Sequence, residues 1–334
     1  MRVAVYHGAG RIELSERPDP VAGPGELVVR VRACGLCGSD LMAWYQDPRA
    51  PLVLGHEPAG EVEEVGRGAR FAVGDRVFVH HHVPCGDCAR CRAGRDTLCD
   101  AFRRTRIDPG GLAERIRVPA ENVRADVLRL PDDLPHWAAT LVEPLACVVR
   151  GQRWAGVGTG ARVVVVGAGA MGLLEVEAAW AAGAAAVVAV EPRADRRALA
   201  RDAGAATIPA SEPAAVRAAL GGELADQVFV CTSDRRAIAD ALHLAAPGGV
   251  VQLFAPTPPG ELVPIDLGSA FFREVTLQST YSAGPADTRA ALALLSSGAV
   301  DSGRLVSHRL PLSQVEEAFR LARSGEATKV VVEP

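Results

Sequence analysis

The sequence predicts a two-domain α/β protein, with a β-rich first part followed by a doubly wound parallel sheet. A chain of 334 residues is longer than one typical hydrophobic core requires and fits two domains. Short apolar segments separated by Gly and Pro fill the first 148 residues, a spacing typical of a small β-barrel or sandwich. From about residue 161, apolar strands alternate with helix-like segments, the pattern of a parallel sheet covered on both faces.

The expected elements follow the chain in that order. The strands of the first part are residues 26–33, 60–65, 75–80 and 112–118. The second part has strands at 162–166, 186–190, 228–231 and 250–254, and helices at 171–182, 194–203 and 235–245. The last part has helical character over 288–298 and 310–323 and strand character over 329–332. We therefore expect domains at 1–150 and 151–285, with residues 286–334 returning to the first domain.

Composition excludes several classes of protein. The net charge of −4 and the absence of a polybasic run argue against nucleic acid as a partner. The N-terminal residues lack a cationic segment followed by an apolar one, so we expect no signal peptide. The apolar stretch 176–190 is interrupted by Glu177 and Gly183, so we expect no membrane span. The expected location is the cytoplasm.

Four cysteines form the most specific motif of the first part. Cys85, Cys88, Cys91 and Cys99 are spaced C-x2-C-x2-C-x7-C in a loop-like lobe at about residues 84–100. Thiolates at this spacing can close a tetrahedral shell around one Zn²⁺, which leaves no open position and makes the metal structural. The alternatives are two disulfides or four unrelated cysteines. The remaining cysteines are scattered and do not suggest a secreted disulfide framework.

A glycine-rich turn marks a dinucleotide site of the Rossmann type. The motif Gly167-Ala168-Gly169-Ala170-Met171-Gly172 follows an expected strand and opens an expected helix. Gly167 allows a tight turn, Gly169 lets a pyrophosphate approach the backbone, and Gly172 lets helix and strand pack closely.

Glu191 ends the next expected strand, where a carboxylate can accept hydrogen bonds from ribose hydroxyls and repel a 2′-phosphate. This favours NAD over NADP, although the nearby Arg193 and Arg196 could accommodate the phosphate. A glycine-rich turn without a ligand is the alternative.

A second group of metal-binding residues is dispersed along the chain. Cys37, His56 and Glu57 offer a thiolate, an imidazole and a carboxylate, a set suited to an open zinc site. Glu143, just before the second domain, is a candidate third or exchangeable ligand. His56 taken alone would more often be an ordinary surface or core histidine.

The motifs together resemble the zinc-dependent medium-chain dehydrogenases, which include alcohol, sorbitol and threonine dehydrogenases. The resemblance covers essentially the whole chain. The motifs that carry it are residues 55–60 with Gly66, residues 74–77, the four-cysteine lobe, residues 110–114 and residues 143–145. It implies a GroES-like β-barrel catalytic domain, a Rossmann domain and a homodimer or homotetramer. We expect the subunit contact around residues 276–281.

The resemblance also implies roles for individual residues. Cys37 and His56 match the fixed ligands of a catalytic zinc, and Glu57 matches the ligand or near-ligand of the sorbitol-type branch. Glu143 stands where many alcohol dehydrogenases have cysteine and polyol enzymes have glutamate, with Cys147 as a rival. Ser39 is implied as the acceptor of the alcohol proton. The implied cofactor-binding residues are Gly167, Gly169, Met171, Gly172, Glu191, Arg196, Thr232 and Ser279.

One position departs from the family pattern. Relatives often carry a histidine where this chain has Met42, and a thioether cannot relay protons. The proton must then leave through ribose hydroxyls, water, Glu57 or Glu143. Three consecutive histidines, His80 to His82, also suggest a metal, but alternating strand residues point to opposite faces, so they cannot all bind one ion.

The sequence therefore predicts a zinc-dependent, NAD-linked oxidoreductase with two zinc ions per subunit. It would interconvert a secondary alcohol of a polyol, sugar or cyclitol and its ketone by hydride transfer, with zinc as Lewis acid. The enzyme alternative is an L-threonine-type or simple alcohol dehydrogenase. The alternative from another class is an inactive nucleotide-binding relative, which would have little reason to keep Cys37, His56, Glu57 and Glu143.

Overall fold

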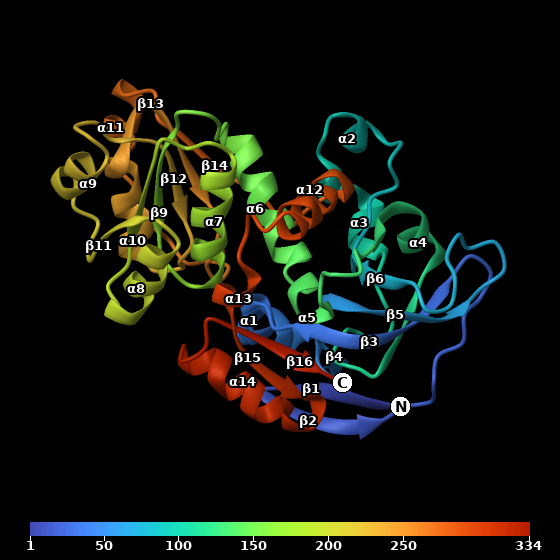
Figure 1. Cartoon of the computed structure of the whole chain (residues 1–334). Helices are drawn as coiled ribbons and strands as arrows, with labels where there is room; N and C mark the ends of the chain where they lie inside the picture. The colour runs from blue at the N-terminus through green and yellow to red at the C-terminus, as the bar shows by residue number, and fades with distance from the viewer. The chain divides into compact units, whose positions relative to one another are not determined.

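The computed structural model describes all 334 residues and divides them into two compact units. Unit 1 comprises residues 1–146, 283–296 and 302–334, and unit 2 comprises 147–282 and 297–301. Both ends of the chain belong to unit 1 (Figure 1). The last segment of the chain thus completes the unit that the first segment begins.

Unit 1 is built on two sheets. The larger sheet runs in the order β15 (Val306–Pro311), β16 (Lys329–Glu333), β3 (Leu27–Gly35), β5 (Glu57–Val65), β6 (Arg76–Val79) and β8 (Val127–Arg129), with β7 (Arg115–Val118) also paired to β3. The smaller sheet is β2 (Arg11–Glu16), β1 (Arg2–Gly8) and β4 (Leu52–Val53). In β3, Val29 and Val31 are buried while Arg30 and Arg32 are exposed, because one face of the sheet packs on the core.

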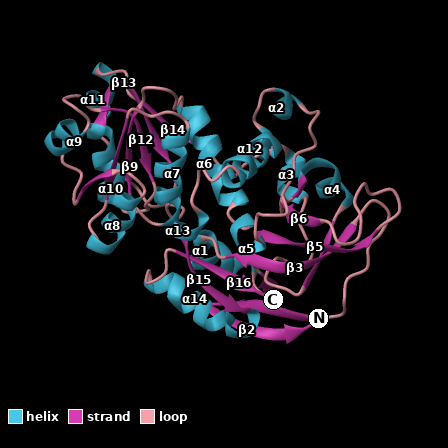
Figure 2. Cartoon of the chain, viewed as in Figure 1, coloured by secondary structure: helices cyan, strands magenta, loops and turns pink.

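Unit 2 is a six-stranded parallel sheet with helices on both sides (Figure 2). Its strand order is β11 (Ala206–Ile208), β10 (Ala186–Val190), β9 (Arg162–Val166), β12 (Ala225–Val230), β13 (Ala245–Leu253) and β14 (Thr276–Ser279). After β9 the chain adds β10 and β11 on one side of it and then β12, β13 and β14 on the other. The strand order therefore reverses between β9 and β12, and at such a switch point the loops that follow the strands separate and leave a crevice. Val164, Val188 and Val228 are fully buried, as strands covered on both faces require.

The helices complete the two units. They are α1 (Ala43–Gln46), α2 (Ala89–Arg92), α3 (Asp100–Arg104), α4 (Ala120–Asp126), α5 (His136–Ala139), α6 (Val142–Ala155), α7 (Ala170–Ala181), α8 (Ala194–Asp202), α9 (Pro213–Ala219), α10 (Arg235–Ala241), α11 (Leu267–Phe272), α12 (Pro285–Ser296), α13 (Ser302–Leu305) and α14 (Val315–Ser324). The division between the units falls within α6.

The predicted α/β fold class is confirmed, and β9 and β10 have the expected bounds. The expected helix over 310–323 is partly wrong, because Leu310 and Pro311 end β15 and α14 begins only at Val315. Pro311 has no N–H, and it disfavours helical geometry for the residue before it. The expected start of the strand at 250 is also late, since β13 already begins at Ala245.

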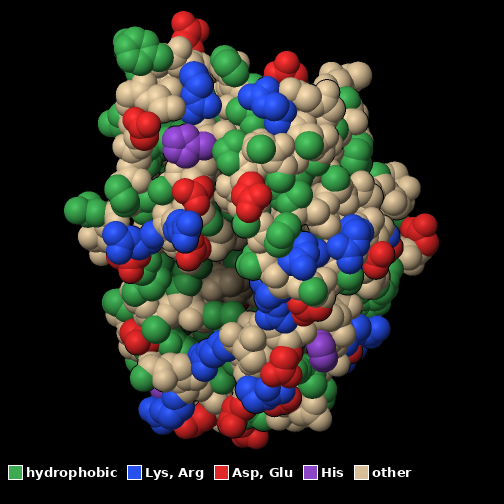
Figure 3. Space-filling model, turned by 90° about the vertical axis from the view of Figure 1, so that its left-hand side faces the viewer, with side chains coloured by type: hydrophobic (Ala, Val, Ile, Leu, Met, Phe, Trp, Pro, Cys, Tyr) green, Lys and Arg blue, Asp and Glu red, His purple; other side chains and the backbone are tan.

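None of the helices is both long and apolar enough to cross a membrane. On the face drawn in Figure 3, basic and acidic side chains are interspersed and do not gather by sign. The surface there offers no extended basic field.

Candidate active site and structural metal centre

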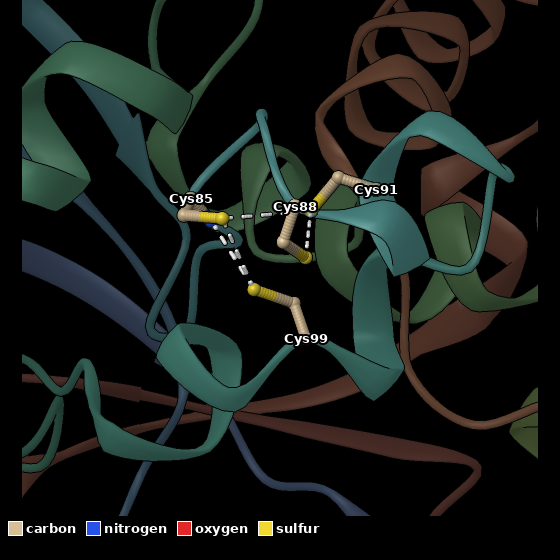
Figure 4. A group of neighbouring side chains, drawn as sticks. All are labelled: Cys85, Cys88, Cys91 and Cys99. Carbon is tan, nitrogen blue, oxygen red and sulfur yellow. Dashed lines mark hydrogen bonds between the residues drawn. The ribbon is translucent and has the colours of Figure 1, made fainter.

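The four thiols of the cysteine lobe converge in the loop after β6 (Figure 4). The Sγ atoms of Cys88 and Cys91 lie 3.5 Å apart, those of Cys85 and Cys99 3.5 Å apart, and those of Cys85 and Cys91 3.9 Å apart. A tetrahedron with arms of about 2.3 Å has edges of about 3.8 Å, so the spacing fits one Zn²⁺. A disulfide has an S–S bond of about 2.05 Å, and all eight cysteines are free thiols.

Cys99 is the thiol best prepared to bind a cation. It precedes the first turn of α3, and its sulfur accepts a hydrogen bond of 3.4 Å from the Cys85 backbone N–H. Burial raises the pKa of Cys99, but N–H groups of Cys85, Phe102 and Ala101 outweigh burial and lower the pKa to about 6. A thiolate is the form that a zinc site needs.

Cys37, His56 and Glu57 are brought together from two strands that are neighbours in the sheet. Cys37 lies just beyond β3, His56 just before β5, and Glu57 is the first residue of β5. One ligand atom from each of the three lies within 4.8 Å of the other two. A thiol, an imidazole and a carboxylate at this separation can hold one metal ion and leave a coordination position open.

Asp40 organises this group in two ways. Its Oδ2 accepts a hydrogen bond of 3.0 Å from the Cys37 backbone N–H, which closes the short turn Gly38–Leu41, and its Oδ1 lies 3.4 Å from His56 Nδ1. Burial lowers the pKa of His56, but Asp40 and the Cys37 thiol outweigh it, so that the pKa lies well above the usual value. The same negative surroundings favour a metal cation, and Nδ1 faces Asp40, which leaves Nε2 for the metal.

Glu57 has a charged partner that no sequence motif predicted. Lys329 of β16 places its Nζ 2.7 Å from Oε1 and 2.5 Å from Oε2 of Glu57. Both side chains are buried. Burial raises the pKa of Glu57 and outweighs the opposing charge of Lys329. Glu57 therefore lies within ligand range of the other two residues but is already engaged, and it fits the role of an exchangeable ligand better than a fixed one.

The Glu143 carboxylate, in the first turn of α6, forms a neighbouring group with His80 and His81. Ligand atoms of these three residues lie within 4.8 Å of one another. β6 ends at Val79, so strand alternation does not apply to His80, His81 and His82. Two of the three histidines belong to this group and His82 lies outside it, in agreement with the expectation that all three do not share one ion. Burial lowers the pKa of His81 well below its usual value, so its ring is neutral at pH 7.

Ser39 lies in the same short turn as Cys37 and is half-buried. Its backbone carbonyl accepts a hydrogen bond of 2.9 Å from Gln46 Nε2. Met42 ends this turn and is also only partly buried. Ser39 is thus part of the same turn that carries Cys37.

The glycine turn after β9 has the geometry that a dinucleotide needs. A Cβ on Gly172 would lie 1.8 Å from the Gly167 carbonyl oxygen, so only glycine allows α7 to begin so close to β9. Gly167 has φ +94°, and its N–H donates to the Val190 carbonyl at 2.8 Å. A Cβ on Gly169 would meet only Arg196, at 3.9 Å. The backbone of the turn is therefore open at the N-terminus of α7.

Glu191 fastens this turn to the end of β10. Its Oε2 accepts a 2.9 Å hydrogen bond from the Ala168 N–H, and its Oε1 accepts one of 2.9 Å from the Arg193 N–H. Each carboxylate oxygen retains a second lone pair for a ribose hydroxyl. Arg193 pairs with Asp195 at 2.6 Å, and Arg196 lies beside Gly169.

The other predicted cofactor residues lie at different distances from the glycine turn. Met171 is in the first turn of α7. A Cβ on Gly167 would come within 3.5 Å of Thr232 Cβ, which places Thr232 beside the turn. Ser279 is the last residue of β14, two strands away from β12, and its side chain is exposed.

Comparison with protein families identifies both parts of the chain. Residues 23–132 match the alcohol dehydrogenase GroES-like domain, and residues 170–297 match the zinc-binding dehydrogenase domain.

Curated relatives and solved structures match nearly the whole chain. A D-altritol 5-dehydrogenase from Agrobacterium fabrum is 36% identical over 96% of this chain and 96% of its own length. An L-threonine 3-dehydrogenase from Bacillus subtilis is 33% identical over 98% of this chain and 96% of its own length. A structure from Sinorhizobium meliloti described as a zinc-binding dehydrogenase bound to NADP is 31% identical, with a TM-score of 0.88, over 100% of this chain and 99% of that chain.

Proposed function

Because this chain belongs to the zinc-dependent medium-chain dehydrogenase family, we propose that it oxidises a secondary hydroxyl of a polyol, sugar or cyclitol with NAD. The observation that carries the proposal is the gathering of Cys37, His56 and Glu57, with a carboxylate rather than a second thiolate at Glu143. Hard oxygen ligands suit a metal that exchanges water and substrate hydroxyls. D-altritol, the substrate in the name of one relative, is a polyol.

The two metal groups take different roles in this proposal. Cys85, Cys88, Cys91 and Cys99 would hold a structural zinc, because four thiolates close its coordination shell. Cys37 and His56 would be the fixed ligands of a catalytic zinc, with Glu57 and Glu143 as exchangeable carboxylates. When bound, this second ion supplies Lewis-acid polarisation of the substrate oxygen.

The protein's own side chains orient the metal ligands and accept the proton of the alcohol. Asp40 fixes the His56 ring and the Cys37 turn, so that the fixed ligands keep one orientation. Ser39 Oγ accepts the alcohol proton from the same turn. Met42 cannot pass that proton onward, because a thioether sulfur carries no proton, so the path from Ser39 must run through water or a carboxylate.

NAD is the proposed cofactor, and when bound it would supply the hydride acceptor. Gly167, Gly169, Met171 and Gly172 would cradle the pyrophosphate at the start of α7, and Glu191 would accept from the ribose. The buried carboxylate of Glu191 supports NAD over NADP, because a 2′-phosphate would meet its charge. Arg193 is engaged by Asp195, which lessens its availability for a phosphate. Arg196, Thr232 and Ser279 are the remaining proposed cofactor contacts.

A homodimer or homotetramer is proposed from the exposed end of unit 2. β14 is an edge strand of the sheet, and large apolar side chains on it and around it are unusually exposed. They are Leu262, Leu267, Phe271, Phe272, Leu277 and Tyr281. Apolar groups beside an unpaired strand edge favour pairing with a second copy of the chain.

We also propose the cytoplasm as the location, because all eight cysteines are free thiols.

The test is NADH or NADPH formation at 340 nm by zinc-loaded protein with polyols, cyclitols, sugars, L-threonine and simple alcohols. Turnover of one polyol class with NAD is the expected result. L-threonine is included because one relative of similar identity is named for it. Preference for L-threonine, or no turnover of any compound, would contradict the proposal.

Two cysteine variants test the metal assignment. Cys37→Ser should lose one zinc per chain and reduce activity by at least 100-fold, while the fold is retained, since a fixed ligand is removed. Cys147→Ser is the matched control and should keep its full zinc content and its activity. The opposite pattern would move the ligand role to Cys147.

A further inference from the structure

Three hydrogen-bond acceptors meet beside the proposed catalytic metal site. His80 Nε2 and His81 Nδ1 are both buried and have no hydrogen-bond partner. A ligand atom from each ring and a carboxylate oxygen of Glu143 lie within 4.8 Å of one another. Buried polar atoms without partners cost stability, so their persistence points to a ligand that satisfies them.

The His80 ring is held in place through its Nδ1 atom. Its Nδ1 lies 2.7 Å from Asp126 Oδ2, and Asp126 Oδ1 accepts a 2.7 Å hydrogen bond from Thr288 Oγ1. His80 and Asp126 have no exposed side-chain area. A carboxylate on Nδ1 fixes the tautomer with the proton on Nδ1, so Nε2 carries a lone pair. The unpartnered nitrogen is therefore an oriented acceptor.

His81 connects this group to the metal site. Its ring centroid lies 4.9 Å from that of His56, and the residue is only partly buried, unlike His80. Burial keeps this ring neutral at pH 7 by lowering its pKa, and a neutral imidazole has one nitrogen that accepts a hydrogen bond. Nδ1 is buried and has no partner, so it is the candidate acceptor, one ring away from a proposed zinc ligand.

We propose that His80, His81 and Glu143 form a subsite for a second substrate hydroxyl, on the carbon next to the one that is oxidised. His81 Nδ1 accepts the proton of that hydroxyl, and His81 is the specificity-determining residue of the subsite. The inference rests on the proposed polyol oxidation and identifies the second hydroxyl as the group of the substrate that the subsite recognises. The enzyme then prefers a vicinal diol to an alcohol with a single hydroxyl.

The charge expected at the neighbouring Cys37 and His56 group favours a hydroxyl over a cation as the occupant of the subsite. An ammonium group or a further metal ion at this subsite would stand beside the cation that Cys37 and His56 hold, and like charges repel strongly at such a separation. A hydroxyl brings donors without net charge. An amino alcohol and a third zinc are therefore the disfavoured occupants, and both are outcomes of the test.

The kinetic test compares 2,3-butanediol with 2-butanol, which differ by one hydroxyl next to the reacting carbon. For the wild type, kcat/KM should be about 10- to 100-fold higher with the diol, since a site built to bind a hydroxyl rejects an analogue that lacks it. His81→Leu should reduce this ratio to near one. His81→Asn should preserve much of it, because the amide oxygen can take the place of Nδ1.

His82→Asn is the matched control, since the His82 ring adjoins His81 but bonds to the Thr105 carbonyl. It should leave the diol preference intact. A diol preference that survives in His81→Leu would overturn the inference. So would a zinc content that falls from three ions to two in that variant, or a preference for an amino alcohol over the diol.

A measurement without turnover separates this inference from the proposed function. In ¹⁵N-histidine NMR spectra of the zinc-loaded enzyme with NADH, the diol should shift the His81 Nδ1 resonance and 2-butanol should not. A shift in a protein that turns over no polyol would support the subsite and contradict the proposed reaction. Polyol turnover with no shift would leave the reaction standing and overturn the subsite.

Discussion

The Nζ of Lys329 lies 2.7 Å and 2.5 Å from the two carboxylate oxygens of Glu57, in the interior of unit 1. The two residues are 272 positions apart in the chain and belong to strands on either side of β3. Gly35 of β3 makes the approach possible, since a Cβ there would lie 1.9 Å from Glu57 Oε2 and 3.1 Å from Lys329 Cε. The last strand of the chain therefore supplies the counter-charge for a residue of the metal site.

Replacing Lys329 by Met should destabilise the metal-free protein by about 3 kcal/mol, because the buried Glu57 carboxyl would lose its charged partner, whether it stays ionised or takes up a proton. Zinc should restore part of this loss by supplying a positive charge next to Glu57. Urea unfolding with and without zinc measures both effects.

Arg309→Met is the control for this variant. It removes an ion pair with Glu333 that joins the adjacent strands β15 and β16 but is partly exposed to solvent. It should cost at most about 0.5 kcal/mol. Equal losses in the two variants would contradict the role given to the buried pair.

Cys99→Ser tests the cysteine lobe. The variant should lose one zinc per chain and melt several degrees lower, because the lobe has little core of its own and its fold depends on the metal. Cys231→Ser, at a thiol of unit 2 outside both metal groups, should leave the zinc content unchanged. Metal analysis and thermal unfolding of the two variants give the comparison. Full zinc content in Cys99→Ser would rule out the four-thiolate site.

Local motifs predicted much of this molecule because their chemistry is local. The glycine turn follows from backbone sterics between Gly167 and Gly172, and the cysteine lobe follows from the reach of thiols at short spacing. The strand Arg162–Val166 is apolar along its whole length, which a buried parallel strand requires.

Long-range partners could not be predicted in the same way. Lys329 meets Glu57, and Thr288 meets Asp126, only because the chain returns to unit 1 after forming the sheet of unit 2. A single Lys within an apolar strand was the one available signal for the first pair. The pairing of His80 with His81 was missed because the strand was expected to extend to residue 80, whereas β6 ends at Val79.

Glu191→Ala should change the choice of cofactor. The carboxylate is proposed to hold the ribose of NAD and to repel a 2′-phosphate, so its loss should lower kcat/KM for NAD by about 10- to 100-fold. The value for NADP should change less or rise, and the NAD:NADP ratio should narrow. Initial rates with both cofactors decide this, and an unchanged ratio would remove Glu191 from the ribose site. Because Glu191 also bonds to the Ala168 N–H, thermal unfolding of the variant should be measured alongside.

The pH dependence of stability should report on His82. Burial lowers the pKa of His82 from 6.5 to about 4, with the Thr105 carbonyl as a weaker opposing influence. Between these two values the unfolded chain binds a proton that the folded protein refuses, so stability falls as the pH drops from 6.5 towards 4. A difference of this size corresponds to about 3 kcal/mol over that range.

His82→Asn keeps a donor for the Thr105 carbonyl and removes the titration. Its free energy of unfolding should vary less with pH between 6.5 and 4 than that of the wild type, and the two curves should run parallel above pH 7.5. Urea unfolding at half-unit pH intervals measures the difference, with His243→Asn on the exposed surface as the control. A wild-type slope that survives in His82→Asn would assign the acid sensitivity to another group. A slope reduced equally by His243→Asn would show that burial of His82 is not its cause.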